Sequence, residues 1–369
     1  MDSANLFIGL MSGTSIDAVD AVAVSFDNDN LKLVGHHSLP IKEDLRQAIL
    51  QLCNPQTDSV QLLAETDHRL GKLYAKTSLA LLNKLGLQSS AIAAIGCHGQ
   101  TIRHSAPVEG AIPYSLQIGD ANRVAVETDI AVVADFRRKD MALGGQGAPL
   151  VPAFHRHVFA SPNAHRVIVN VGGIANITSL PTDGGCLGFD TGPGNVLMDL
   201  WSQPHLGTRY DHNGDWAASG SVQGKLLQQF KRCDFFATPA PKSTGRELFN
   251  SNWLNTQLAD FSQISPQDVQ ATLLCLTADT ICEAIAGLSS PAEEVYICGG
   301  GAFNTQLVNV LAEKLPKVST TETLGISPSW VEACAFAWLA KRRLEHKAGN
   351  LVEATGAVRE AVLGALYLP

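Results

Sequence analysis

The chain has 369 residues, enough for two α/β domains of ordinary size or for one large one. Apolar residues make up 45% of it and charged residues 17%, a balance that excludes a disordered chain. The net charge of −8 gives no broad cationic surface, so neither a nucleic acid nor a membrane is an expected partner. Anionic small molecules remain candidate ligands, because glycine turns and helix N-termini bind phosphate locally.

The eight cysteines are scattered and form no C-x-x-C pair, which argues against a zinc site or a redox pair. The chain begins without the basic and apolar regions of a signal peptide, and it has no apolar run long enough to cross a membrane. These features predict a cytoplasmic protein with free thiols.

The first half of the chain reads as three strands, two helices and a fourth strand that runs into a polar glycine loop. The apolar periodicity and the turn residues predict strands at 5–11, 17–26, 31–41 and 91–95, turns at 12–15 and 27–30, helices at 44–53 and 59–85, and a loop at 96–101.

The second half repeats this plan. It predicts strands at 167–171, 174–180, 186–189 and 295–298, a helix at 265–287, and a helix that follows the loop 299–304 and ends at 315. Two such halves predict two α/β domains around a cleft, with ligands at the strand ends. We place the first domain at 1–135, joined by 350–369, and the second at 136–349, with an insertion near 210–252.

Two glycine turns occupy matched positions in the two halves. The first is Gly9-Leu-Met-Ser-Gly-Thr-Ser-Ile-Asp17 and the second is Asn170-Val-Gly-Gly-Ile-Ala-Asn176. Small residues let backbone N–H groups approach phosphate oxygens, and Asp17 could orient a hydrated Mg²⁺ on a nucleotide. The alternative is a pair of plain tight hairpins whose polar residues only serve the turns.

A third glycine turn carries an acidic residue. Asp190 lies at the end of the predicted strand and begins the run Asp-Thr-Gly-Pro-Gly. A carboxylate beside mobile glycines is well placed to act as a general base on a hydroxyl or a water molecule. The alternative is an Asp that caps the following turn. The Asp-Thr-Gly-Pro-Gly run favours the catalytic role, because its residues give the backbone conformational freedom and contribute little to packing.

A fourth glycine turn, Gly299-Gly-Gly-Ala-Phe-Asn304, fails the spacing of a dinucleotide-binding turn. It would serve as a platform under an adenine or a ribose, or only as a tightly packed turn between strand and helix. The chain has no P-loop, no protein-kinase motif set and no G-x-S-x-G elbow.

Polar residues near the middle of the chain suggest a substrate pocket. His98 and Gln100 follow a predicted strand with the hydrogen-bonding groups that a sugar needs, and Arg137 or Arg138 could hold a carboxylate. A buried turn and a solvated charge run are the alternatives. Glu332 has its own alternative, since Ser329-Trp-Val-Glu332 matches a capping box for the helix that ends near 345.

The motifs together resemble one family, the anhydro-N-acetylmuramic acid kinases. The resemblance rests on Gly9-Leu-Met-Ser-Gly-Thr-Ser-Ile-Asp17, Gly96-Cys-His-Gly-Gln-Thr101, Gln117-Ile-Gly-Asp120, Asp135-Phe-Arg-Arg138, Gly144-Gly-Gln-Gly-Ala-Pro149, Asn170-Val-Gly-Gly-Ile-Ala-Asn176, Phe189-Asp-Thr-Gly-Pro-Gly-Asn195, Pro241-Lys-Ser-Thr-Gly-Arg-Glu247 and Cys298-Gly-Gly-Gly301. It runs nearly from end to end. One departure is Ala18, where the family usually has glycine.

The resemblance implies an actin/Hsp70/sugar-kinase-like (ribonuclease H-like) fold of two α/β domains with ATP in the interdomain cleft. The implied reaction turns 1,6-anhydro-N-acetylmuramic acid, ATP and water into N-acetylmuramic acid 6-phosphate and ADP, in peptidoglycan recycling. Asp190 matches the catalytic base that activates the water, and Glu332 matches a second active-site carboxylate. The amino sugar is the expected small-molecule partner, and a homodimer is left open.

The candidate site residues fall into three groups besides the two carboxylates. The candidates for binding ATP are Gly13, Thr14, Ser15, Ile16, Asp17, Ala18, Val19, Asp20, Gly172, Gly173, Asn176, Gly299, Gly300 and Gly301. The candidates for binding the substrate are His98, Gln100, Arg137 and Gly147. Asp17 is the candidate for Mg²⁺.

Two other functions stay open on the sequence alone. One is a kinase of the same fold that phosphorylates an ordinary sugar or acid and needs no water as co-substrate. The other is an ATP-dependent clamp without catalysis, since phosphate turns by themselves do not distinguish a clamp from an enzyme.

Overall fold

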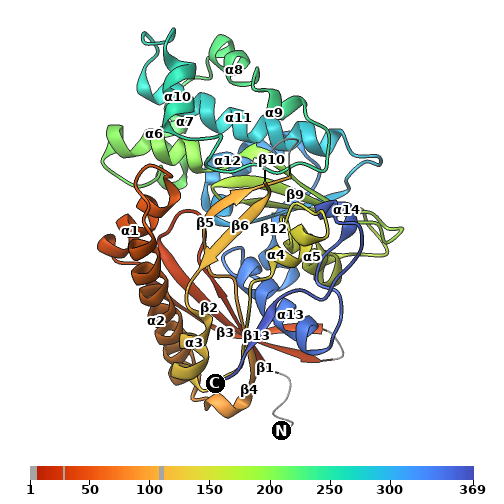
Figure 1. Cartoon of the computed structure of the whole chain (residues 1–369). Helices are drawn as coiled ribbons and strands as arrows, with labels where there is room; N and C mark the ends of the chain where they lie inside the picture. Colours follow the sequence, from red (N-terminus) through yellow and green to blue (C-terminus); the bar gives the residue numbers. More distant parts are fainter. Residues whose placement is uncertain (1–5, 28–29, 108–111) are drawn as a thin grey trace. The chain divides into compact units, whose positions relative to one another are not determined.

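The computed structural model describes residues 6–27, 30–107 and 112–369. The chain forms two compact units, one made of Met1–Phe154 with Trp330–Pro369 and the other of His155–Ser329 (Figure 1). The sequence placed the boundaries near 135 and 349. The first unit therefore includes about twenty more residues than predicted in each of its two segments, since these end at 154 and begin at 330. Residue 5 of the first predicted strand and residues 28–29 of the predicted turn lie outside the described residues.

The first unit is built on a six-stranded sheet with the order β13-β7-β4-β1-β2-β3. Its strands are β1 Leu6–Met11, β2 Ala18–Asp27, β3 Asn30–Pro40, β4 Ile92–Cys97, β7 Val132–Ala134 and β13 Ala365–Tyr367. Strands β1, β2 and β3 are antiparallel, whereas β4 is parallel to both β1 and β7. The four strands predicted from the sequence are confirmed. The short strands β7 and β13, and the hairpin of β5 (Gln100–Ser105) and β6 (Tyr114–Ile118), were not predicted.

Helices complete the first unit. They are α1 Glu43–Cys53, α2 Val60–Leu85, α3 Ala121–Thr128, α4 Arg137–Ala142, α13 Val331–Leu344 and α14 Val352–Thr355, while α5 (Val151–Phe159) runs across the boundary of the two units. Helix α2 begins at a Ser59 cap and ends at Gly86, whose φ of +66° favours glycine. Apolar side chains of α1, α2 and α3 share a core with the sheet.

The packing of helix α13 explains why the first unit includes the chain from Trp330 onward. It packs directly on β1 and β4 at Gly9 and Gly96, where any side chain larger than that of glycine would have no space. A Cβ added at Gly9 would lie 1.8 Å from the carbonyl oxygen of Ala333, and one at Gly96 would lie 1.9 Å from that of Phe336. The helix therefore belongs to the first core, although its sequence position suggested the second domain.

The second unit repeats the plan with a five-stranded sheet in the order β10-β9-β8-β11-β12. Its strands are β8 Arg166–Val171, β9 Ile174–Leu180, β10 Leu187–Pro193, β11 Glu294–Cys298 and β12 Val318–Thr320. Strands β8, β9 and β10 are antiparallel, and β11 is parallel to β8 and β12. Two copies of this order, one in each unit, form the actin/Hsp70/sugar-kinase-like fold that the resemblance implied.

The helices of the second unit are α6 Val196–Leu206, α7 Asp215–Ala218, α8 Gly224–Phe230, α9 Asp234–Ala237, α10 Ser251–Leu258, α11 Pro266–Ala286 and α12 Thr305–Lys314. The predicted insertion forms the short helices α7, α8 and α9. Helix α11 is the one helix of the described residues that is long and apolar enough to cross a membrane, by length and composition only. Of its most apolar stretch 67% is buried within the protein, and its side chains contribute to the second core.

Candidate active site

The turn after β1 combines one buried anchor with exposed groups. The hydroxyl of Ser12 is buried and lies 2.6 Å from the hydroxyl of Tyr74 on helix α2. Ile16 takes a left-handed φ of +56°, and its N–H donates to the carbonyl of Gly13. Thr14 and Ser15 are exposed. The turn is thus fixed to the core at Ser12 and presents Thr14 and Ser15 to solvent, as a phosphate-binding turn requires.

Replacement of Tyr74 by Phe is expected to loosen this turn. The change removes the hydrogen bond to Ser12, whose hydroxyl then keeps only its longer contact of 3.5 Å with the carbonyl of Gly99, and this costs about 0.5–1.5 kcal/mol of unfolding free energy. The resemblance assigns ATP to this turn, so the Michaelis constant for ATP should rise when the anchor of the turn is lost, while that for the sugar changes less. Urea unfolding and steady-state kinetics check both effects, and unchanged ATP kinetics would contradict the anchoring role.

Two carboxylates at this turn suit a nucleotide-bound cation. Asp17 is exposed. The pKa of Asp20 is raised by burial and also by the charge of Asp17, while a hydrogen bond from Ser38 lowers it. The described residues contain no group of three His, Cys, Asp or Glu side chains that could hold a metal. Mg²⁺ on a nucleotide usually takes only one or two protein carboxylates, so Asp17 with Asp20 fits that cation.

Three of the four substrate candidates are joined by hydrogen bonds in the first unit. Arg137 donates through one terminal nitrogen to the carbonyl of Gly147 (2.8 Å) and through the other to Nε2 of His98 (2.8 Å). A guanidinium can only donate, so His98 accepts and is neutral. Burial, and then the charge of Arg137, hold the pKa of His98 well below its usual range. The fourth candidate, Gln100, donates to the carbonyl of Gly13 at 3.4 Å.

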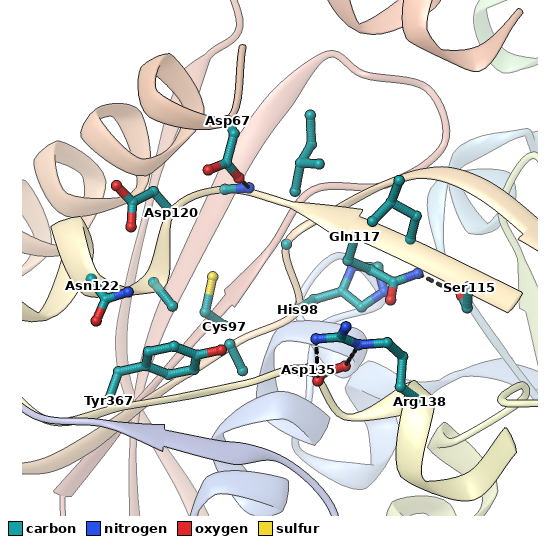
Figure 2. Close-up of a pocket in the computed structure, with 16 residues that line it drawn as sticks. Asp67, Cys97, His98, Ser115, Gln117, Asp120, Asn122, Asp135, Arg138 and Tyr367 are labelled. Carbon is teal, nitrogen blue, oxygen red and sulfur yellow. Dashed lines mark hydrogen bonds and ion pairs between the residues drawn. The ribbon is translucent and has the colours of Figure 1, made fainter. Parts of the chain in front are cut away.

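A polar pocket of about 240 Å³ lies beside His98 (Figure 2). Its polar lining comes from helices α2, α3 and α4, from strands β6 and β13, and from the segments next to β6 and β7, and it includes Asp67, Ser115, Gln117, Asp120, Asn122, Asp135, Arg138 and Tyr367. Figure 2 shows Arg138 facing Asp135, which it contacts at 2.6 Å and 2.7 Å. Of the two arginines that the sequence could not separate, Arg137 thus holds His98 and Gly147, and Arg138 lies at the pocket.

Glu332 occupies the first turn of α13, but the predicted capping box is absent. The N-cap position belongs to Trp330, which makes no side-chain cap hydrogen bond, so Ser329 lies one residue too early. The helix start is set by the packing of α13 on β1 and β4. Four residues after Glu332, Phe336 packs against the His98 ring, with the centroids 4.6 Å apart and the ring planes tilted by 42°. Residues at this spacing share one helix face, so Glu332 lies on the face that meets His98.

In the second unit, Asp190 lies inside β10 and not at the end of a strand as predicted. The strand continues to Pro193, and its pairing with β9 is irregular between Asp190 and Gly192. Only 8% of Asp190 is exposed, and its Oδ2 accepts a hydrogen bond from the N–H of Thr244 (2.9 Å). Its own N–H donates to the carbonyl of Lys242 (3.0 Å). The loop at 242–244, which is distant in the sequence, therefore binds both the carboxylate and the backbone of Asp190.

The sequence reasoning did not select Lys242 as a site residue. Burial lowers the pKa of the Lys242 ammonium, and the charge of Asp190 acts in the opposite direction. The ammonium donates to the carbonyls of Phe235 and Phe236. The one sequence signal was the segment Pro239-Ala-Pro-Lys-Ser-Thr-Gly-Arg246, whose composition predicts an ordered surface loop that could form a wall of the substrate site.

The three glycine turns of the second unit meet at Val171, where β8 ends beside the end of β11. The backbone N–H of Asn195 donates to the carbonyl of Gly172, and its side chain donates to that of Val171. A Cβ added at Gly301 would lie 2.3 Å from the Val171 side chain. Close packing therefore explains Gly301, and Gly299 is equally crowded by Asn170. Gly300 is exposed.

Neighbouring polar side chains also link these turns to Asp190. Asn176 on β9 lies opposite Asn170 on β8 and opposite Asp190 on β10. The structure thus gathers Asp190, Asn176, and the turns at 172–173 and 299–301 in the second unit. It gathers His98, Gln100, Arg137, Gly147 and the turn at 13–20 in the first.

Three histidines with lowered pKa values make the protein sensitive to acid; His98 and His155 are buried and His104 is half-buried. Burial lowers the pKa of His155 to about 3 and that of His104 to about 4, and the pKa of His98 is also well below its usual value. Below about pH 6.5 the histidines of the unfolded chain take up protons that those of the folded chain do not. The free energy of unfolding therefore decreases as the pH is lowered. Each histidine should add about 1.4 kcal/mol per pH unit to this slope. Urea unfolding between pH 7.5 and 5.5 measures it, and a flat profile would contradict the burial.

Comparison with known proteins relates the whole chain to one family. A family model described as anhydro-N-acetylmuramic acid kinase matches residues 5–369. Proteins of the same name are 51% identical in Shewanella pealeana, over 98% of both chains, and 49% identical in Vibrio cholerae, over 100% of both. A solved structure, the activator of the 2-hydroxyisocaproyl-CoA dehydratase from Clostridium difficile with bound ADPNP, is 13% identical over 92% of this chain and 96% of its own, with a TM-score of 0.48. That likeness is too distant to inform the function. The family match and the identities show that this chain belongs to the anhydro-N-acetylmuramic acid kinase family.

Proposed function

We propose that this kinase opens the 1,6-anhydro ring of 1,6-anhydro-N-acetylmuramic acid with water and phosphorylates O6 with ATP. The products are N-acetylmuramic acid 6-phosphate and ADP. The observation that carries the proposal is Asp190, a nearly buried carboxylate held by Thr244 and placed in the Asp-Thr-Gly-Pro-Gly run.

In the proposed reaction Asp190 takes a proton from water as the water oxygen bonds to the anomeric carbon. The bond between that carbon and O6 breaks, and O6 is freed as a nucleophile. O6 then bonds to the γ-phosphorus as the bond to the ADP oxygen breaks. Phosphoryl transfer of this kind depends on positioning and charge neutralisation more than on covalent help from the protein. Glu332 is proposed as the second carboxylate, on the α13 face that meets His98.

ATP is assigned to the turn at 13–20, to Gly172, Gly173 and Asn176, and to the turn at 299–301. Exposed Thr14, Ser15 and Gly300 support this assignment. Mg²⁺, held by Asp17 with Asp20, would neutralise phosphate charge. With a net charge of −8, the protein has no overall attraction for ATP, so local N–H groups and the cation must supply it.

The amino sugar is assigned to His98, Gln100, Arg137 and Gly147. His98 is neutral and held by Arg137, which suits hydrogen bonding to an uncharged hydroxyl or ring oxygen. The polar pocket beside His98 would take a substituent of the sugar, with Arg138 available to a carboxylate in competition with Asp135. We also propose a cytoplasmic location and a role in peptidoglycan recycling, which rest on the family.

Coupled ADP release tests the proposed substrate. ADP should form rapidly with 1,6-anhydro-N-acetylmuramic acid and at background rate with glucose, N-acetylglucosamine and N-acetylmuramic acid. Rapid release with a sugar that has no anhydro ring would favour an ordinary sugar kinase. ADP release that no sugar increases above background would favour an ATP-dependent clamp.

A further inference from the structure

A fully buried carboxylate, Asp140, lies outside all the sites described above. It is 0% exposed and sits near the end of helix α4. Its Oδ2 accepts from the N–H of Gly147 (2.9 Å). Its Oδ1 accepts from Nδ2 of Asn350 (2.7 Å) and from the hydroxyl of Thr355 (2.8 Å). One carboxylate thus joins the loop at 143–149 to the C-terminal segment.

The contact with Gly147 continues to the substrate candidates. The carbonyl of Gly147 accepts from Arg137, and Arg137 donates to His98, with both distances 2.8 Å. An unbroken series of hydrogen bonds therefore runs from Asp140 to His98. Packing reinforces its first step, because a Cβ at Gly145 would lie 2.3 Å from Oδ2 of Asp140. The position of Asp140 sets that of Gly147 and hence that of the Arg137 guanidinium.

The C-terminal segment supports the same loop from its backbone. The N–H of Gln146 donates to the carbonyl of Thr355 (2.7 Å), and the N–H of Val358 donates to that of Leu143 (2.9 Å). Asn350 is itself held, because its Oδ1 accepts from the N–H of Ala361 (2.7 Å). These contacts place the segment at 350–358 against the loop that carries Gly147.

We propose that Asp140 is a positioning residue for sugar binding, and that Asn350 and Thr355 form its fixed support. Asp140 acts through Gly147 and Arg137 and does not itself touch the substrate. The inference rests on the proposed function, because it requires that Arg137 and His98 contact the amino sugar.

Asp140→Asn is the direct test. The amide oxygen can still accept from Asn350 and Thr355, but the amide NH₂ then faces the N–H of Gly147, so donor meets donor. The Michaelis constant for the anhydro sugar should rise about tenfold, the effect expected for loss of one hydrogen bond to a charged group. That for ATP should stay within about twofold, since the phosphate turn lies outside this series.

A second pair of variants keeps the test open if Asp140→Asn fails to fold. Thr355→Val removes one support of the carboxylate and should raise the sugar Michaelis constant in the same way, whereas Thr355→Ser keeps the hydroxyl and should restore it. Asp211→Asn in the second unit is the matched control. Asp211 is also buried and also accepts from backbone N–H groups, those of Trp216 and Ala217, so it should lose stability without a change in either Michaelis constant.

The outcomes separate this inference from the proposed function. If Asp140→Asn only lowers the melting temperature and the turnover, as a purely structural residue would, the positioning role is wrong. If Arg137→Ala raises the sugar Michaelis constant and both Asp140→Asn and Thr355→Val leave it unchanged, the sugar site stands and the positioning role falls. If Arg137→Ala itself leaves sugar binding unchanged, the proposed sugar site fails, and the positioning role fails with it.

Discussion

Asp190→Asn is expected to lower kcat by about 10²–10⁴-fold, the range for loss of a general base, in a protein that folds normally. The amide oxygen can still accept the hydrogen bond from Thr244, and the backbone contact with Lys242 is unaffected. What the amide cannot do is take a proton from water. Steady-state ADP release measures the loss, and circular dichroism with thermal melting shows whether the fold is kept.

The control for this variant is Asp183→Asn, an Asp in the exposed turn after β9 of the same unit. Its carboxylate also accepts from a backbone N–H, that of Gly185. The substitution chemistry is therefore the same, but the catalytic proposal gives Asp183 no role, and kcat should be unchanged. A kcat of Asp190→Asn close to that of the unmodified protein would remove Asp190 from the mechanism.

Gly9→Ala is expected to lower the unfolding free energy by about 3 kcal/mol, at the upper end of the range for inserting a group into a packed core. The new Cβ would lie 1.8 Å from the carbonyl oxygen of Ala333, so helix α13 must move away from β1. Turnover should fall as well, because Glu332 is the residue before Ala333 and moves with the helix. Urea unfolding measures the first effect and ADP release the second.

Gly224→Ala is the matched substitution at a glycine without such contacts. Nothing lies within 4 Å of a Cβ built there, and the residue begins helix α8. Alanine at this position should be neutral or slightly stabilising. Equal stability of Gly9→Ala and Gly224→Ala would show that α13 does not lie on β1 as closely as described.

Local patterns predicted the elements that carry strong periodicity. The strands β1, β2, β8 and β9 alternate or are continuously apolar between clear turns, and α2 and α11 have serine caps. The hairpin of β5 and β6 was missed because its strands are short and polar. The start of α13 was misplaced because the capping signature at Ser329 is local, whereas the contacts of Gly9 and Gly96 with this helix join residues more than 200 positions apart.

The candidate site residues show the same difference between local sequence signals and long-range contacts. Glycine turns and isolated polar residues made Asp190 and His98 candidates, because both follow predicted apolar strands, and the charged segment before the loop at 143–149 made Arg137 one. The partner of Asp190 could not be predicted, since Thr244 lies 54 positions away, and neither could the role of Asp140, whose partner Thr355 lies 215 positions away. Only the folded chain brings those residues together.

The most direct test of the proposed reaction is the fate of oxygen from solvent. The kinase should be run with 1,6-anhydro-N-acetylmuramic acid and ATP in H₂¹⁸O, and the phosphorylated sugar analysed by mass spectrometry before anomeric exchange proceeds. We expect one ¹⁸O at the anomeric carbon and none at O6 or in the transferred phosphoryl group, with one ADP formed for each label. A phosphorylated product without solvent oxygen at the anomeric carbon would contradict the account.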